Sequence, residues 1–380
     1  MKKSIDFNVH FNYLEGNNFI QRFASAYMFL EAKTNPEAIF YDPEIGGQCF
    51  GCGSGGEKHS CKKDKAAAKR CAFFFIFNTM CGNSAIRRRF DGTPTEMQKL
   101  IGDTIDEGRG CGSDFTTDFL FGYTGYQYHK CTDTARFKDE ITASINAGKP
   151  VIAKVKSGNP RFHLITGYDG GDLIIPEFIF YDFSTNPPTE KSEKAPAYDD
   201  LEVLYLFGEK TTRRYTLKDA LNNIRRVMEY NINSGLWDEY LVKLGGCDKF
   251  PSDDGLDKAE PDERKFRAQN LAETNMYMYN FCSFGGAFGS EKLPDHYLHK
   301  ELFEPALAEL WGNINDSHWA IVDAGHITGK LHREQIWLID DPAKISELSE
   351  EICREILKAK NADISMLGII NQAAEILEKK

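Results

Sequence analysis

The chain has 380 residues, 41% of them hydrophobic and 12% aromatic, which supplies a full apolar core and enough length for about two domains. This composition excludes a disordered chain. Asp and Glu outnumber Lys and Arg by 57 to 46, for a net charge of −11, and such a surface repels nucleic acid and anionic membranes.

The N-terminus and the cysteine content bear on where the protein works. Polar residues within Met-Lys-Lys-Ser-Ile-Asp-Phe-Asn interrupt the apolar core that a signal peptide needs. The longest strongly apolar run, residues 71–77, is far shorter than the roughly 20 residues that cross a bilayer. A chain of this length needs no disulfides, so we expect its ten cysteines to be thiols. We therefore expect a soluble, cytoplasmic protein without a membrane partner.

A helix and a glycine-rich insertion are predicted for the first 70 residues. Apolar side chains at positions 19, 20, 23, 27 and 30 follow a helical period, with Asn17 or Asn18 as the cap. Residues 41–70 are rich in glycine and basic side chains, which predicts a loop or insertion. Four cysteines lie in or beside it, with His59 nearby, and they are candidate ligands of a structural zinc ion: Cys49, Cys52, Cys61 and Cys71. Their spacing is not that of a standard finger, and inert or redox-active thiols are the alternatives.

Helices dominate the prediction for the next 80 residues. The chain is strand-like from Ala72, and we expect it to turn helical after Cys81 and to remain so up to Asp91-Gly92. A second helix begins at Thr93-Pro94-Thr95-Glu96 and continues through Ile101, because Pro94 suits a first turn. Residues 137–146 form a third helix, stopped by a Gly-Lys-Pro sequence.

The clearest sheet signal follows. Residues 151–155, 162–168 and 172–175 are rich in apolar and β-branched side chains, with Asp169-Gly170-Gly171 as a turn, and residues 201–207 add a further strand. We expect these strands to be antiparallel neighbours.

Beyond residue 210 the pattern becomes mainly helical. We predict a helix over 217–244 capped by Thr216, helices around 262–282 and 301–311, a strand-like piece at 319–324, and two amphipathic helices at 345–358 and 364–378. The last two either pack on the core or build a homodimer. The fold class is therefore α+β, with an antiparallel mixed core over 1–210 and a mainly helical domain over 211–380.

Two residues in this pattern suit nucleophilic catalysis. Cys81 stands where we expect a helix to begin, and His163 opens a strand of the hairpin. A helix N-terminus and an imidazole together make a thiol nucleophilic, and the amides at Gly82 and Asn83 would stabilise an oxyanion. A buried, structurally satisfied histidine is the alternative for His163.

The acid that would orient His163 is harder to assign. Glu177, just after the second arm of the hairpin, is the first choice, and Asp182 is the second. Two further histidines, His318 and His326, lie beside acidic residues, which suggests a second site or a metal, with a lid or packing role as the alternative.

Three short motifs carry a family resemblance: Cys-Gly-x-Ser-Ala at 81–85, Gly-Lys-Pro-Val-Ile at 148–152, and His-Leu-Ile-Thr-Gly-Tyr-Asp-Gly at 163–170. Together they resemble the papain-like fold of the double-glycine bacteriocin-processing peptidases, and more closely the butirosin-biosynthesis acyltransferase family. They are also similar to the cysteine-protease homologues that form amide bonds in thiotemplated peptide pathways. The match covers about residues 78–182. It departs from the peptidase pattern in having no Gln shortly before Cys81, and Pro176-Glu177 where an Asp-Pro is usual.

The resemblance implies natural-product biosynthesis. An acyl group would pass from an acyl carrier protein or another thioester, through Cys81, to a small amine or diamine, with His163 as base and no cofactor. The acidic surface would attract a cationic acceptor. Two alternatives are open: a peptidase or amidohydrolase that uses water as acceptor, and an inactive scaffold that binds a small molecule or a partner.

Overall fold

The computed structural model describes residues 2–7, 18–34, 76–102, 112–157, 161–176, 179–182, 189–246, 305–337 and 341–379. The fold is α+β, and each described pair of strands is antiparallel. The described residues form two compact units. The sheet unit contains those of 1–77 and 100–216, and the helical unit contains those of 78–99, 217–289 and 302–380. The change of unit after Thr216 lies near the predicted boundary, whereas segment 78–99 groups with the C-terminal helices.

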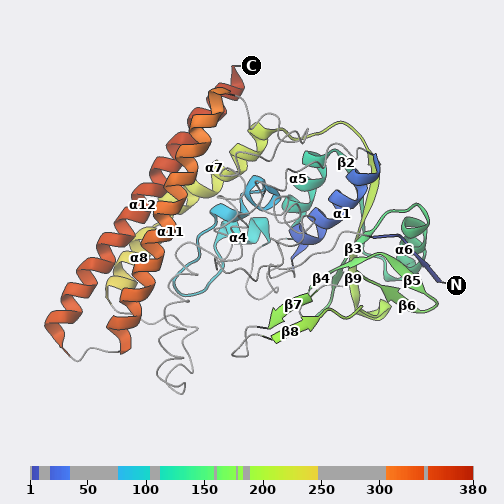
Figure 1. Cartoon of the computed structure of the whole chain (residues 1–380), viewed down its shortest axis with the longest axis horizontal. Coiled ribbons are helices and arrows are strands. Elements are labelled where there is room, and N and C mark those ends of the chain that lie inside the picture. Colours follow the sequence, from blue (N-terminus) through green and yellow to red (C-terminus); the bar gives the residue numbers. More distant parts are fainter. Residues whose placement is uncertain are drawn as a thin grey trace, which may run out of the picture. The chain divides into compact units, whose positions relative to one another are not determined.

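The largest described sheet of the sheet unit has four strands (Figure 1). Its order is β2-β9-β3-β4, with β2 at Tyr126–Cys131, β3 at Val151–Val155, β4 at Phe162–Ile165 and β9 at Leu201–Lys210. The strands predicted over 151–155 and 201–207 are therefore confirmed, as is their antiparallel pairing. Ile152 on β3 lies opposite Leu164 on β4 and opposite Tyr205 on β9.

Helices pack on this sheet through two sets of apolar side chains. The first helix, α1 (Phe19–Thr34), contacts β3 and β4, and Phe19 meets Tyr205 with ring centroids 5.0 Å apart. Helix α6 (Phe137–Asn146) contacts β3 and β9 and joins a core of Phe137, Ile141, Ile145, Val151, Ala153, Ile165 and Leu204. Helix α5 (Asp114–Thr124) contacts β2. The sheet is therefore buried through aromatic contacts on α1 and aliphatic contacts on α6.

The strand predicted over 162–168 is divided in the structure. Residues beyond β4 continue as β5 (Gly167–Asp169), which lies between β1 (Lys2–Ser4) and β6 (Asp172–Ile174) in a separate sheet. A Cβ at Gly167 would lie 2.6 Å from the backbone oxygen of Lys3, so glycine is required where β1 approaches. A further hairpin pairs β7 (Ile179–Asp182) with β8 (Thr189–Ser192).

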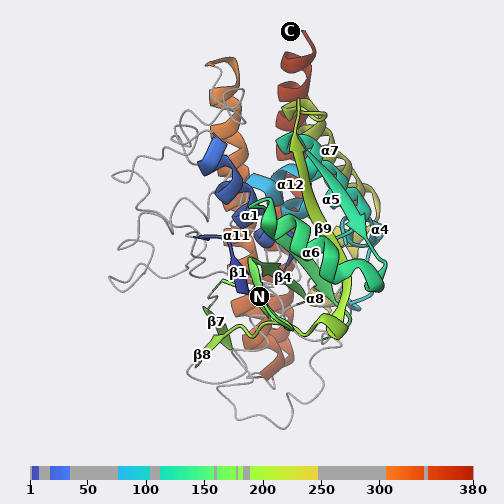
Figure 2. The same ribbon diagram turned by 90° about the vertical axis from the view of Figure 1, so that its right-hand side faces the viewer.

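The described part of the helical unit is dominated by helices (Figures 1 and 2). Among them are α7 (Leu217–Asn233), α8 (Leu236–Gly245), α11 (Pro305–Trp337) and α12 (Pro342–Glu378). Helices α11 and α12 run side by side, and α12 also contacts α7 and α8.

Three predictions for this unit are wrong. The helix predicted over 217–244 is broken before α8, because Gly235 adopts a φ of 78°. The strand-like piece at 319–324 lies inside α11, where Ile321 and Val322 are buried and packing outweighs their β propensity. The two C-terminal helices are one continuous α12, because the chain around residue 361 contains no helix-breaking residue.

One predicted helix cap is confirmed, whereas Pro94 precedes the helix of residues 96–101 instead of lying in its first turn. Asn18 accepts a hydrogen bond from the backbone N–H of Gln21 at 3.0 Å and begins α1. Thr95 and Gln98 bond reciprocally at 3.0 and 3.1 Å ahead of α4 (Glu96–Ile101), which is a capping box. Helix α6 has the predicted bounds.

Several predictions fall on residues outside those that the structure describes. They include the insertion at 41–70 and the helix around 262–282. Within the described residues, no helix combines the length and the apolar character that crossing a membrane requires.

Candidate functional site

His163 lies on β4, at the edge of the four-stranded sheet, opposite Ala153. Its neighbour Phe162 packs against Phe19 of α1 with ring centroids 5.7 Å apart. Because side chains alternate along a strand, His163 points to the other face. The residue is only 5% exposed, so its ring depends on protein groups rather than on water.

A carboxylate faces the imidazole of His163. Oε1 of Glu193, which directly follows β8, lies 2.7 Å from Nδ1 of His163, and the two side chains are 1% and 6% exposed. This is an ion-pair separation, although the direction of approach does not satisfy hydrogen-bond geometry. A carboxylate on Nδ1 favours the tautomer that carries its proton there and leaves Nε2 to accept another.

Arg22 fixes the carboxylate from its other side. Its terminal NH2 group contacts Oε2 of Glu193, and its Nε donates to the backbone oxygen of Phe162 at 3.0 Å. The Arg22 side chain is 2% exposed. One guanidinium from α1 therefore ties Glu193 to the strand that carries His163. A buried carboxylate needs such partners, because loss of water is costly for an isolated charge.

The predicted acids are not described at this position. Glu177 lies outside the described residues, and Asp182 ends β7 with a side chain that is not described. Glu193 was missed because it is distant in sequence from the hairpin of His163. Arg22 was the available signal in the sequence, because it is a charged residue on the apolar face of a predicted helix. An arginine buried there needs an acidic partner.

Cys81 does not begin a helix, which corrects the prediction. Residues 76–80 are helical, Cys81 follows in a turn, and its Sγ donates to the backbone oxygen of Asn78 at 3.4 Å. The sulfur is a thiol and the residue is fully buried. The positive pole of a helix dipole therefore does not act on Cys81, which lies at the opposite end of a helical segment.

Gly82 and Asn83 do not begin an α-helix either. Gly82 has a φ of 88° and caps the three-residue 3₁₀ turn Asn83–Ala85, after which the chain is extended. Its amide donates to the backbone oxygen of Thr79 at 2.8 Å, as glycines that end helices do. The oxyanion role predicted from a helix N-terminus therefore has no helix to support it. The Cys-Gly pair itself was the missed signal, since glycine so often follows a helix.

Polar side chains hold the Cys81 turn on the helical unit. From α7, Asn223 donates to the backbone oxygen of Met80 at 3.3 Å and Asn231 donates to that of Ala85 at 2.6 Å. Within the turn, Asn83 Nδ2 donates to Asn78 Oδ1 at 2.6 Å. The bond to Met80 satisfies a carbonyl oxygen that the end of a helical segment would leave unpaired.

Arg87 anchors the chain beyond this turn. Its guanidinium pairs with Asp363 of α12 at 2.9 Å, and Trp237 of α8 donates to the same carboxylate at 3.1 Å. Arg87 and Asp363 are 3% and 0% exposed. Burial raises the pKa of Asp363, although Arg87 and Trp237 act in the opposite direction.

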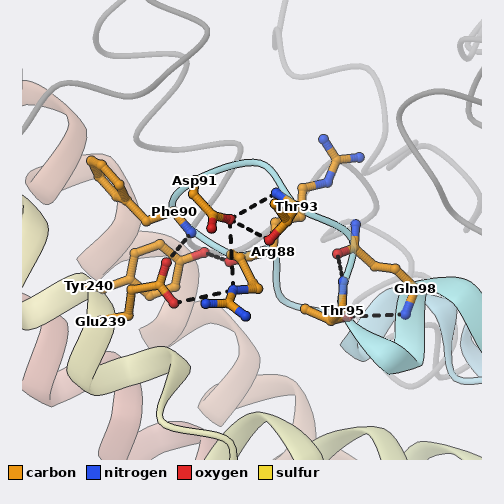
Figure 3. A network of polar contacts seen from close by, with 9 residues as sticks. Arg88, Phe90, Asp91, Thr93, Thr95, Gln98, Glu239 and Tyr240 are labelled. Atoms are coloured by element: carbon orange, nitrogen blue, oxygen red, sulfur yellow. Dashed lines mark hydrogen bonds and ion pairs between the residues drawn. The ribbon is translucent and has the colours of Figure 1, made fainter.

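The backbone that follows Arg87 is held by side chains of α8 (Figure 3). Glu239 of α8 accepts from the backbone N–H of Phe90 at 2.8 Å, and the Tyr240 hydroxyl donates to the backbone oxygen of Arg88. Burial raises the pKa of Tyr240, which keeps this donor protonated. The backbone of residues 88–90 is therefore attached to α8.

His318 lies in α11 and is 3% exposed. Burial, helped by the charge of Arg87, lowers the pKa of His318 to about 3. The ring is neutral near pH 7, which favours packing over a second acid–base site.

The predicted zinc ligands Cys49, Cys52, Cys61 and Cys71 lie outside the described residues. No protein-family model and no curated protein sequence matches the chain.

Proposed function

We propose that the protein is a cysteine acyltransferase with a papain-like core, which forms an amide from a carrier-protein thioester and an amine. The observation that carries the proposal is the buried series Arg22, Glu193 and His163 in the sheet unit. A base held by a carboxylate, itself held by a second charge, is what general-base catalysis requires. A histidine that only filled space would not need two buried charges behind it.

Within this proposal each residue has one role. Glu193 orients the His163 ring, and Arg22 is a positioning residue that holds Glu193 in place. The proposal requires Nε2 of His163 to take the proton of the Cys81 thiol, after which the sulfur would attack the thioester carbonyl. The carrier thiol leaves with that proton. An amine then attacks the new thioester on Cys81, the C–S bond breaks to release the amide, and the Cys81 sulfur regains a proton from the attacking amine through the base.

The acceptor decides between transfer and hydrolysis. A thioester on Cys81 is open to water and to an amine, and the amine wins where the site excludes water and positions the acceptor. The net charge of −11 supports a cationic acceptor, since it raises the local concentration of amines.

Intact-protein mass spectrometry tests the proposal. The full chain is treated with octanoyl N-acetylcysteamine thioester, with or without 1,4-diaminobutane, and the adduct is located by peptide mapping. We expect one octanoyl group on Cys81, and its release as the diamine amide. Cys81→Ala and His163→Ala should abolish both, whereas Cys353→Ala, which removes a half-buried thiol of the helical unit, should change neither.

Two outcomes point elsewhere. Release of octanoate at equal rates with and without diamine assigns the same residues to a hydrolase. A wild-type chain that acquires no adduct on Cys81 overturns the enzyme. The full burial of Cys81 favours the second candidate in that case, a scaffold that binds a small molecule. Alkylation by iodoacetamide at neutral pH separates the enzyme from the scaffold, because a catalytic thiol is alkylated preferentially and a structural one resists.

A further inference from the structure

Three side chains of types that can ligate metals come together from strand β2 and helix α6 in the sheet unit. They are His129 and Cys131 on β2 and Glu140 on α6, and one ligand atom from each lies within 4.8 Å of the others. None of them belongs to the Arg22, Glu193 and His163 series.

The fold explains why these side chains meet. Cys131 is 3% exposed and belongs to the core that contains Phe137 and Ile141 of α6, so its side chain faces that helix. His129 is two residues earlier on the same strand and therefore shares that face. Glu140 lies in the first turn of α6. His129 is exposed, which places one side of the group in solvent.

We propose that His129, Cys131 and Glu140 bind a zinc ion. Thiolate, imidazole and carboxylate are the three ligand types that zinc takes in proteins, and a thiolate disfavours magnesium and calcium. One thiolate and one carboxylate also neutralise the two charges of the ion. Tetrahedral zinc holds its ligand atoms roughly 3.4–3.6 Å apart, so the side chains need to close by little more than about 1 Å.

The surroundings of Glu140 and Cys131 suit this role. Arg136, one turn earlier, contacts one oxygen of Glu140, and a carboxylate has a second oxygen for the metal. Such an outer partner fixes the direction of a ligand. The thiol of Cys131 makes a long contact, 3.7 Å, to the backbone oxygen of Asp133. With three protein ligands, the fourth position is left for water on the exposed side of His129.

Cobalt titration tests the site. The full chain, stripped of metal, is titrated with Co²⁺, whose thiolate charge-transfer and ligand-field bands report a tetrahedral site, and bound Zn²⁺ is counted by competition. Because Cys49, Cys52, Cys61 and Cys71 are candidate ligands elsewhere, all variants are compared in a background with these four changed to serine. Circular dichroism checks that each variant is folded.

We expect the background chain to bind one equivalent of zinc. Cys131→Ser and Glu140→Gln should each weaken binding at least tenfold, and His129→Ala, a change at an exposed position, should do so without affecting the fold. Cys353→Ser removes a thiol outside the site and should leave binding unchanged. If the background does not fold, the same three changes in the natural sequence should each remove one equivalent. A chain that binds no tetrahedral cobalt, or binds it equally in the His129→Ala variant, overturns the site.

Discussion

Nδ1 of His163 and Oε1 of Glu193 are 2.7 Å apart in an environment almost closed to water. A carboxylate in that position decides which nitrogen of the ring carries the proton, and so decides which one can act as a base. The His163–Glu193 pair is thus the part of the sheet unit whose chemistry is most open to test.

Replacement of Glu193 by Gln keeps the shape of the side chain and removes its charge. We expect kcat/KM for acyl transfer to fall by about 10²- to 10⁴-fold, because the ring loses its orientation and the charge that stabilises imidazolium. Steady-state kinetics with the octanoyl thioester measure the effect. Glu202→Gln is the matched control. Glu202 is 41% exposed on β9, in the sheet that carries His163, and its replacement should change the rate less than twofold. Equal loss in both variants would contradict an orienting role.

Replacement of Arg22 by Met tests the buried pair from its other side. The change leaves Glu193 buried without its cation, so we expect a loss of about 3–5 kcal/mol in the free energy of unfolding. The double change Arg22→Met and Glu193→Gln should be more stable than Arg22→Met alone, because it also removes the stranded charge. Urea titrations of the wild type, Arg22→Met, Glu193→Gln and the double variant give the four free energies of unfolding for a double-mutant cycle. Simple additivity would mean that the two side chains do not interact.

Local signals in the sequence predicted much of the fold but not the site. Helix α6 was predicted with its bounds because its apolar period and the Gly-Lys-Pro sequence after it are both local. Glu193 could not be found in this way, because folding of the β7–β8 hairpin brings it to His163. The Cys81 turn was misread because glycine can stand at either end of a helix, and Gly82 ends the helical segment at 76–80 and leads into a short 3₁₀ turn.

Asp363 should be among the most sensitive residues of the helical unit. Its change to Ala leaves Arg87 buried without a counter-charge, and we expect about 3–5 kcal/mol of destabilisation. The control is Asp238→Ala, which breaks the exposed pair with Lys360, another residue of α12, and should cost under about 1 kcal/mol. Thermal and urea unfolding compare the two. Similar costs for both changes would contradict a buried anchor at Arg87.

Gly82 and Gly92 offer a matched test of the turn after Cys81. Both have positive φ values, 88° and 75°, but a Cβ at Gly82 would lie 3.1 Å from the Asn223 oxygen, whereas nothing lies within 4 Å of one at Gly92. We expect Gly92→Ala to cost about 1 kcal/mol from backbone strain alone. Gly82→Ala should cost more, and should also alter alkylation of Cys81 by iodoacetamide. Equal stability of the two variants would show that the turn does not pack on α7 as described.

The buried histidines of α11 should make the chain acid-sensitive. Burial lowers the pKa of His318 to about 3 and that of His332 to about 4, whereas the unfolded value is 6.5. Between the folded and unfolded values the unfolded chain binds more protons, so stability is complete above pH 6.5 and is lost as the pH falls. From pH 6.5 to 4.5, His318 alone accounts for roughly 2–3 kcal/mol. His318→Leu should therefore flatten the pH dependence of urea unfolding over this range, and adding His332→Leu should flatten it further. A slope that equals that of the wild type in both variants would mean that these rings become protonated without unfolding.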